Sequence, residues 1–266
     1  MDLRPIGVFD SGLGGLTVVK EIKRLLPNES IVYLGDTARV PYGTRSKKTV
    51  TEFSLQNIRF LLKKKVKCIV IACNTSSALA YTRIKVETSV PTFDVIGPGV
   101  RAALSNGLVK KIGIIGTRAT IGSHAYKKAI HKGSSKASIL EVACPLFVPL
   151  IEEGELKGQL IEYTVDKYLK PFIQMKIDIL ILGCTHYPLI KSQLLKKLKK
   201  IRIVDSGKTA AKELSIYLEK NKIVSSKNKK PRDEFFVTDL TDRFIKVAEM
   251  FLEESLQGKI KKVDIN

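Results

Sequence analysis

Short apolar segments alternate with stretches of helical periodicity along this chain. Residues 5–9 form the first apolar segment, and a glycine-rich turn and apolar residues at helical spacing over 16–26 follow it. Residues 30–34 and 68–72 repeat the apolar pattern, with a helical stretch over 53–62 between them. This alternation predicts an α/β fold in which crossover helices join parallel strands.

The pattern restarts in the second half of the chain. Residues 111–116 resemble the first strand and turn, and residues 178–183, which lead to Cys184, resemble the strand that leads to Cys73. Ile112 lies 106 residues after Ile6, and Cys184 lies 111 residues after Cys73. These similar displacements favour an internal duplication of one α/β unit, although repeated strand, turn and helix geometry alone would also produce a similarity this weak.

Two segments rich in chain breakers divide the sequence, at residues 96–99 and 204–207. The residues after the second segment include a helical stretch, a strand at 235–238 and a last helix with one apolar face, too little for a domain of their own. We therefore predict one discontinuous domain, residues 1–97 plus 207–266, which contains Cys73. The predicted second domain spans residues 98–206 and contains Cys184.

Composition indicates an ordinary globular protein. The chain has 266 residues, 44% hydrophobic and 27% charged, which suits two small domains or one large one. The longest apolar run, residues 69–73, is far too short for a membrane span, and the first residues lack the basic and apolar regions of a signal peptide. We expect a cytoplasmic protein whose four cysteines, which lack metal-type or redox-type pair spacing, are reduced.

The chain is strongly basic, with 46 lysine and arginine residues against 26 acidic ones and a net charge of +20. The excess is spread over residues 1–97, 98–206 and 207–266 as +7, +10 and +3. No aromatic interleaving or nucleic-acid-binding signature accompanies it, which favours a solvated basic surface. A nucleic-acid-binding protein is the alternative.

Cys73 and Cys184 each stand where an apolar strand ends and a polar sequence begins, CNTSSA and CTHYP. Since the carboxyl ends of strands line the ligand crevice in open α/β sheets, both thiols should face a cleft. A position at the start of a helix should also lower the thiol pKa. The alternatives are a buried structural cysteine, which we favour for Cys68 and Cys144, and a disulfide switch between Cys73 and Cys184.

Two thiols that meet on one ligand from two domains suit proton transfer at a carbon atom. A thiolate on one side removes the hydrogen and a thiol on the other side delivers a proton, which inverts the carbon. The reverse reaction needs the same pair with exchanged roles. Near-symmetric surroundings of two thiols are therefore typical of a racemase or epimerase.

Four long motifs resemble bacterial glutamate racemases: GVFDSGLGGLTV at 7–18, YLGDTARVPYG at 33–43, ACNTSSA at 72–78 and GCTHYPL at 183–189. Residues 144–154 and 204–207 add to the resemblance, which runs from Ile6 to about Leu252. The CTHYP stretch favours glutamate racemases over the related aspartate racemases. A racemase of another amino acid such as aspartate, or a basic protein associated with nucleic acid or gyrase, remains the alternative.

The resemblance implies two flavodoxin-like α/β domains with the active site in the cleft between them. It implies no pyridoxal phosphate, metal or other cofactor, glutamate as the substrate, a role in peptidoglycan synthesis, and a homodimer. The catalytic cysteines are Cys73 and Cys184, and the residues that assist them are Asp10, Glu152 and His186. The substrate-binding positions are Asp10, Ser11, Tyr42, Gly43, Asn74, Thr75, Thr185 and His186.

Each assisting residue also has a purely structural interpretation. Asp10 could cap the turn that follows it, His186 could be held by backbone groups, and Glu152 could be a surface carboxylate. Asp36 could shape its own loop. The glycines at 12, 14 and 15 do not have the spacing of a dinucleotide-binding turn, so no Rossmann cofactor site is expected.

Overall fold

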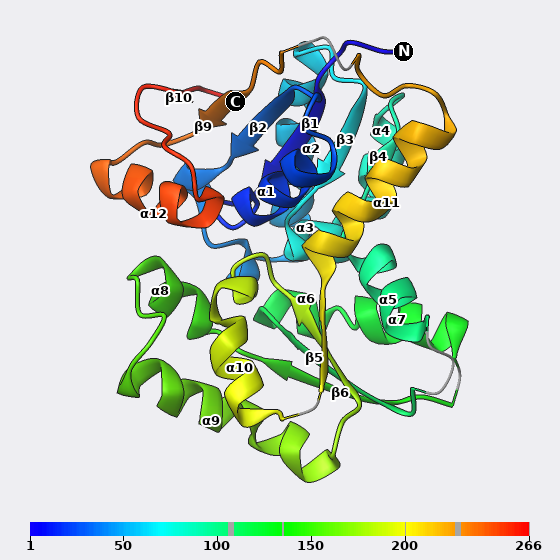
Figure 1. Cartoon of the computed structure of the whole chain (residues 1–266), viewed down its shortest axis with the longest axis vertical. Coiled ribbons are helices and arrows are strands. Elements are labelled where there is room, and N and C mark those ends of the chain that lie inside the picture. Colours follow the sequence, from blue (N-terminus) through cyan, green and yellow to red (C-terminus); the bar gives the residue numbers. More distant parts are fainter. Residues whose placement is uncertain (106–108, 135, 200, 227–229, 266) are drawn as a thin grey trace.

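The protein is described by a computed structural model that covers residues 1–105, 109–134, 136–199, 201–226 and 230–265. It contains two β-sheets, one above the other in Figure 1, with helices packed on both. The larger sheet has the order β10-β9-β2-β1-β3-β4 and the smaller one β6-β5-β7-β8. The strands are β1 (Ile6–Asp10), β2 (Ile31–Gly35), β3 (Cys68–Ile71), β4 (Thr92–Phe93), β5 (Lys111–Gly116), β6 (Ser138–Ala143), β7 (Ile179–Gly183), β8 (Arg202–Asp205), β9 (Glu234–Val237) and β10 (Ile260–Lys262).

Helices connect the strands. They are α1 (Leu16–Leu25), α2 (Lys47–Lys63), α3 (Asn74–Leu79), α4 (Tyr81–Glu87), α5 (Ile96–Leu104), α6 (Arg118–Gly122), α7 (Ala125–Gly133), α8 (Phe147–Glu152), α9 (Gln159–Met175), α10 (Lys191–Lys197), α11 (Ser206–Lys220) and α12 (Asp242–Leu252). Three 3₁₀ turns are η1 (Thr37–Arg39), η2 (Tyr42–Thr44) and η3 (Tyr187–Ile190).

The two sheets share one topology. In each, the first strand of the unit lies between the second and the third, and a fourth strand completes the order β2-β1-β3-β4 or β6-β5-β7-β8. All strand pairs of the described residues are parallel, with Ile6 opposite Cys68 in one sheet and Ile112 opposite Ile179 in the other. This is the flavodoxin-like strand order. The predicted α/β fold of two similar units is thus confirmed, and β9 and β10 extend only the first sheet.

Both faces of the larger sheet are covered, because its strands are apolar on both sides. Ile6 and Val8 of β1 belong to the core cluster that includes α1, α11 and α12, whereas Phe9 packs with α2 on the opposite face. In the smaller sheet, Ile112 and Ile114 face α5 and α7, and the other face packs against α9 and α10. The carboxyl ends of the strands are left free of this packing.

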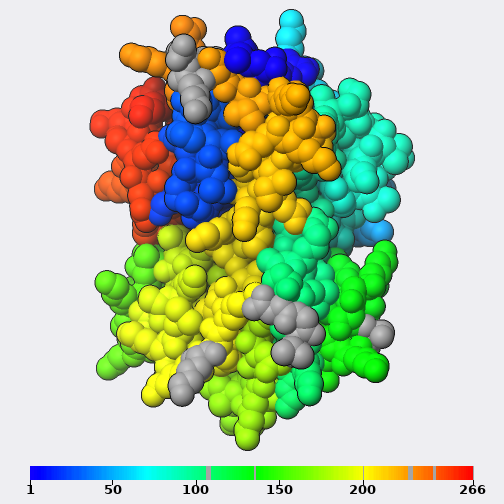
Figure 2. All heavy atoms as spheres, turned by 45° about the vertical axis from the view of Figure 1, so that its right-hand side comes forward, coloured from blue at the N-terminus to red at the C-terminus, as the bar shows by residue number. Residues whose placement is uncertain are grey.

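The segments rich in breakers at 96–99 and 204–207 do not form loops. Residues 96–99 are the first turn of α5, where Pro98 is tolerated because the first backbone N–H groups of a helix have no intrahelical acceptor. Asp205 caps α11 by accepting a hydrogen bond from the Lys208 backbone N–H. Helix α11 runs along the face seen in Figure 2, from the smaller sheet toward the larger. The division into domains at these positions stays a prediction.

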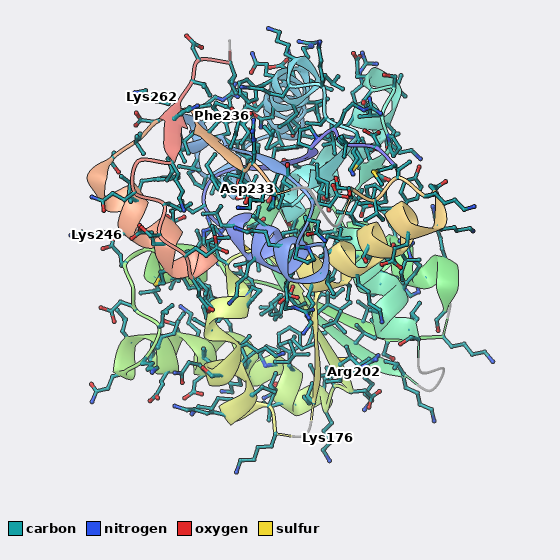
Figure 3. All side chains as sticks on the ribbon, turned by 45° about the horizontal axis from the view of Figure 1, so that its top comes forward. Lys176, Arg202, Asp233, Phe236, Lys246 and Lys262 are labelled. Atoms are coloured by element: carbon teal, nitrogen blue, oxygen red, sulfur yellow. The ribbon has the colours of Figure 1, made fainter. Side chains whose placement is uncertain are left out.

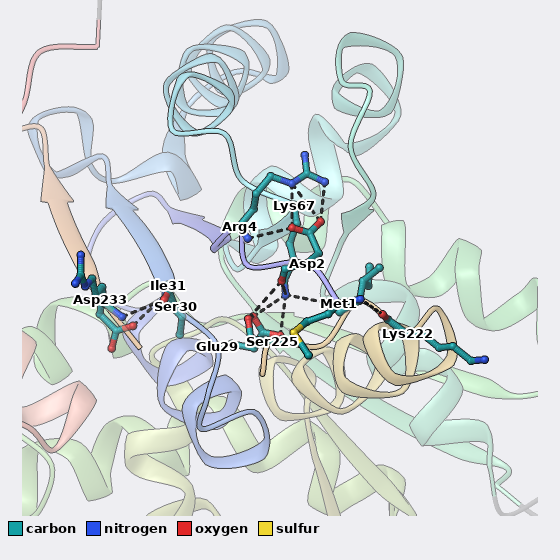
Figure 4. A network of polar contacts seen from close by, with 12 residues as sticks. Met1, Asp2, Arg4, Glu29, Ser30, Ile31, Lys67, Lys222, Ser225 and Asp233 are labelled. Atoms are coloured by element: carbon teal, nitrogen blue, oxygen red, sulfur yellow. Dashed lines mark hydrogen bonds and ion pairs between the residues drawn. The ribbon is translucent and has the colours of Figure 1, made fainter. Parts of the chain in front are cut away.

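A buried ion pair lies at the amino-terminal edge of the larger sheet (Figure 4). The side chains of Lys67 and Glu29 are fully buried, and Lys67 Nζ lies 2.6 Å from Glu29 Oε2. Lys67 also donates hydrogen bonds to the Asp2 and Ile223 carbonyl oxygens, and Glu29 accepts from the backbone N–H and hydroxyl of Ser225. The network therefore joins four segments that are distant in sequence.

Basic side chains are spread over the molecule. Among those labelled in Figure 3, Lys262 ends the edge strand β10 and Lys246 lies on α12, whereas Arg202 begins the edge strand β8 of the smaller sheet and Lys176 follows α9. Lys262 pairs with Asp239 at 2.7 Å. Among the described residues, the helices are too short or too polar to cross a lipid bilayer.

Candidate active site

A cavity of about 280 Å³ lies at the carboxyl ends of the strands of both sheets. Its volume is near the lower end of the range for small-molecule sites, about 300–1,000 Å³. Of the predicted site residues, ten line it: Ser11, Tyr42, Gly43, Cys73, Asn74, Thr75, Glu152, Cys184, Thr185 and His186.

The topology explains why both thiols reach this cavity. Cys73 lies just past the end of β3, and Ser11 directly follows β1. Thr117 follows β5 and Cys184 follows β7, which are the corresponding strands of the second sheet. In each sheet these two neighbouring strands flank the topological switch point, where ligands bind in open α/β sheets. All four cysteines of the chain are buried free thiols.

Cys73 caps the amino terminus of α3. Its Sγ lies 3.5 Å from the Ser76 backbone nitrogen and 3.5 Å from Ser11 Oγ. The expected lowering of its pKa is wrong, because burial and then the charge of Asp10 raise the pKa of Cys73 to about 11, against the hydrogen bonds of Ser11 and Ser76. At neutral pH Cys73 is therefore a thiol in this arrangement.

Asp10 is fully buried at the end of β1 and does not line the cavity. Its Oδ2 accepts a hydrogen bond from the Gly12 backbone N–H at 3.0 Å, so Asp10 caps the turn as its structural interpretation predicts. Its other oxygen has no hydrogen-bond partner among the described residues. Burial raises the pKa of Asp10, and the nearby His186 opposes this shift.

His186 joins the second thiol to a carboxylate. Its Nδ1 lies 3.8 Å from Cys184 Sγ, and its Nε2 lies 2.8 Å from Oε1 of Glu152 at the end of α8. Burial disfavours a charged imidazole, but the hydrogen bonds to Cys184 and Glu152 outweigh it and raise the pKa of His186 to about 10. A positive charge therefore lies beside Cys184. Cys184 itself does not stand at a helix start, because η3 begins three residues after it, at Tyr187. His186 is the residue that caps η3, although its side chain makes no capping hydrogen bond.

The loop that contains Tyr42 and Gly43 is held by a buried carboxylate. Asp36 is fully buried and accepts hydrogen bonds from Arg39 Nε, the Tyr42 hydroxyl and Thr238 Oγ1. The Tyr42 hydroxyl also accepts from Asn57 Nδ2 at 3.1 Å. The Tyr42 hydroxyl is thus engaged by Asp36 and Asn57, and Asp36 shapes the loop as its structural interpretation predicts.

Thr117 is a cavity residue that sequence reasoning missed. Its Oγ1 lies 3.0 Å from Thr75 Oγ1, which links the two halves of the site. The similarity of the two units could have identified Thr117, because it lies 106 residues after Ser11 and follows the corresponding strand. The other lining residues that were not predicted are Gly12, Val40, Pro41, Thr44, Arg118, Pro145, Val148 and Pro149.

The glycine-rich turn after β1 brings the two halves into direct contact. A Cβ atom on Gly14 would lie 2.1 Å from Thr185 Oγ1 and 2.5 Å from His186 Nδ1. The Thr17 hydroxyl lies 3.0 Å from the Thr185 carbonyl oxygen and can donate to it. The absence of a side chain at Gly14 therefore allows the turn after β1 to lie directly against Thr185 and His186, which follow β7. No cluster of three metal-ligating side chains occurs among the described residues.

The profile of the Asp/Glu/Hydantoin racemase family matches residues 6–214. The chain belongs to this family. It is 45% identical over 255 residues to a glutamate racemase of Neisseria meningitidis, with coverage of 96% of this chain and 94% of that protein. A glutamate racemase of Aquifex aeolicus is also 45% identical, with 96% coverage of both chains.

Solved structures agree with this assignment. The structure of glutamate racemase from Francisella tularensis in complex with D-glutamate has a TM-score of 0.94, at 42% identity, and covers 100% of this chain and 99% of that one. The predicted resemblance to glutamate racemases is confirmed. A racemase is an isomerase, so the predicted enzyme class is confirmed as well.

Proposed function

We propose that this enzyme interconverts L- and D-glutamate without a cofactor, by proton transfer at Cα between Cys73 and Cys184. The observation that supports it most is the convergence of two thiols, from corresponding strand ends of two similar sheets, on one small cavity. The glutamate substrate is supported by the relatives named above, one of which was solved with D-glutamate. The surroundings of the two thiols suggest which one acts as the base and which as the acid.

The two thiols have different surroundings in the free enzyme. Cys73 carries its proton, because burial raises its pKa. The imidazolium of His186, held by Glu152, stabilises negative charge on Cys184 Sγ. In the proposed first turnover, the Cys184 thiolate takes the Cα proton and the C–H electron pair stays on Cα, delocalised into the adjacent carboxylate. The Cys73 thiol then gives its proton to the opposite face.

This step leaves Cys184 as a thiol and Cys73 as a thiolate. The enzyme is then ready for the enantiomer, or returns to its first state when protons exchange with solvent. We propose Asp10 as the assistant at Cys73, a role that its burial and its electrostatic interaction with that thiol support. We propose His186 and Glu152 as the corresponding assistants at Cys184.

Polar groups around the cavity are proposed to hold the amino acid. They belong to Ser11, Tyr42, Gly43, Asn74, Thr75, Thr185 and His186. These groups supply the hydrogen bonds that two carboxylates and an ammonium group require. Asp10, also predicted to bind substrate, does not line the cavity in the free enzyme.

The test is racemisation of pure L- or D-glutamate by the purified protein, followed by circular dichroism without added cofactor. Cys73→Ala and Cys184→Ala should each abolish turnover, because one face of Cα then lacks its acid or base. Cys68→Ala is the matched control, because Cys68 is a buried cysteine within β3 that does not line the cavity. Near-normal turnover by either site variant, or faster turnover of aspartate than of glutamate, would contradict the proposal.

We further propose that the D-glutamate serves peptidoglycan synthesis in the cytoplasm and that the enzyme is a homodimer, as the family resemblance implies. Depletion of the enzyme in its host should then stop growth, and added D-glutamate should restore it. Sedimentation should give twice the mass of the chain. Growth that does not respond to D-glutamate would contradict the metabolic role.

A further inference from the structure

The side-chain amide of Asn74 is bonded at one end only. Its Oδ1 accepts a hydrogen bond from the Tyr126 hydroxyl at 2.6 Å, and Ser206 Oγ lies 3.3 Å away. Its Nδ2 is buried and has no hydrogen-bond partner among the described residues. Asn74 lines the cavity and is only 3% exposed. A buried amide donor without an acceptor is costly, and a ligand acceptor in the cavity would satisfy it.

The distances fix which end of the amide faces Tyr126. A separation of 2.6 Å is normal for an O–H donor to an oxygen and short for an N–H donor. Burial raises the pKa of Tyr126, so its hydroxyl keeps its proton and donates. The oxygen of the Asn74 amide therefore points to Tyr126, and the NH₂ group is the end that remains for a ligand.

Tyr126 is itself held rigidly. It is 1% exposed, and its ring lies against two glycines from other elements. A Cβ atom on Gly183 would lie 3.1 Å from the ring, and one on Gly99 would lie 3.6 Å from it. The Ser206 hydroxyl donates its one proton to the Leu182 carbonyl oxygen at 2.8 Å, so Tyr126 is the donor that holds the Asn74 oxygen. Tyr126, packed against the second sheet, thus holds the side chain of Asn74, which begins the helix after β3 of the first sheet.

We propose that Tyr126 is a positioning residue that fixes the Asn74 amide with its NH₂ group toward the cavity. The Asn74 position then recognises a hydrogen-bond acceptor, a carboxylate of the substrate, and not its ammonium group. This inference rests on the proposed function for its substrate. The contact made by Asn74 persists in substrate and transition state alike, so its loss should raise KM more than it lowers kcat.

The test is Tyr126→Phe, which removes the hydroxyl and keeps the ring between its glycines. KM for glutamate should rise about tenfold in both directions, the scale of a hydrogen bond to a charged group, while kcat stays within about twofold. Tyr81→Phe is the control, because it removes a hydroxyl hydrogen bond, to the Thr92 carbonyl oxygen at 3.3 Å, away from the cavity. An unchanged KM, or a fall in kcat alone, would overturn the inference.

A double-variant comparison separates positioning from general support of the fold. In the Asn74→Ala background, Tyr126→Phe should add less than about twofold to KM, because the group it acts on is gone. A full additional rise would overturn the inference. If Tyr126→Phe does not fold, Asn74→Asp is measured instead, because it keeps an acceptor for Tyr126 and replaces the NH₂ donor with an oxygen. KM should then rise at least about tenfold, and an unchanged KM would overturn the inference.

A readout without turnover keeps this inference distinct from the proposed function. The Asn74 side-chain NH₂ signals in a ¹⁵N-labelled free enzyme are assigned by their loss in Asn74→Ala. They should shift in Tyr126→Phe and not in Tyr81→Phe; unshifted signals would overturn the positioning role. Failure of the wild-type enzyme to racemise glutamate would count against the proposed function alone.

Discussion

Gly14→Ala tests whether the close contact between the halves of the molecule sets the geometry of the second thiol. The new Cβ atom would lie 2.5 Å from His186 Nδ1 and 2.7 Å from its Cε1. Side-chain Cβ atoms essentially never approach another heavy atom within 3.0 Å, so the imidazole ring must retreat. Thr185 can turn its hydroxyl away, but His186 is held by Glu152 at 2.8 Å.

The size of the effect follows from the distance. The imidazole nitrogen must move from 2.5 Å to at least 3.0 Å from the new Cβ atom. A misplacement of ~1 Å in an active site lowers the rate about 100-fold, and this displacement is roughly half as large. We therefore expect kcat/KM to fall about 10-fold, about 1.4 kcal/mol in activation free energy. Because the two enantiomers have an equilibrium constant of one, kcat/KM must fall by the same factor in both directions.

The assay is glutamate racemisation followed by circular dichroism, with Gly122→Ala as the matched control. Gly122 ends α6, and a Cβ atom there would meet nothing within 4 Å. The control should stay within about twofold of wild type. If Gly14→Ala folds and retains wild-type kcat/KM, the contact between the turn and His186 does not set the geometry of Cys184, and the reasoning is wrong.

Three further predictions concern charge. Because His186 must keep its proton to stabilise the Cys184 thiolate and its pKa is raised to about 10, kcat/KM should fall as pH rises through about 10. Glu152→Gln should move that fall to lower pH, and an unmoved profile would exclude Glu152 as the partner of His186. Lys67→Met should lower the free energy of unfolding in urea by about 3–5 kcal/mol, because it leaves Glu29 buried without its cation. Lys262→Met, in an exposed ion pair, should lower it by less than about 1 kcal/mol. Equal losses would contradict the importance of the buried pair. DNA binding by the basic surface should vanish by ~200 mM salt, and binding that survives would favour the nucleic-acid alternative.

The strand ends were the part of the site that sequence could predict. Periodicity locates the strands, and in parallel sheets a strand end is also the edge of the ligand crevice, so Cys73 and Cys184 could be placed from local patterns alone. The offset of 106 residues between the two units would have added Thr117. Comparison of the two similar units therefore identifies more of the site residues than either unit does alone.

Contacts between distant segments could not be predicted. Tyr126 and Ser206 reach Asn74 only after the two sheets have packed, and nothing in their local sequence marks them. The pKa of Cys73 was predicted in the wrong direction for a similar reason. The helix start is visible in sequence, but the burial that outweighs it depends on residues from several elements.

The two-thiol mechanism is tested most directly by racemisation in D₂O, with mass and chirality analysed at the first few per cent of conversion. If one sulfur removes the Cα proton and the other supplies a solvent-exchanged one, the product enantiomer contains deuterium at Cα while the remaining substrate stays protiated, from either starting enantiomer. A product that retains the original hydrogen, or deuterium that enters the substrate pool as fast as the product, would contradict two bases on opposite faces of Cα.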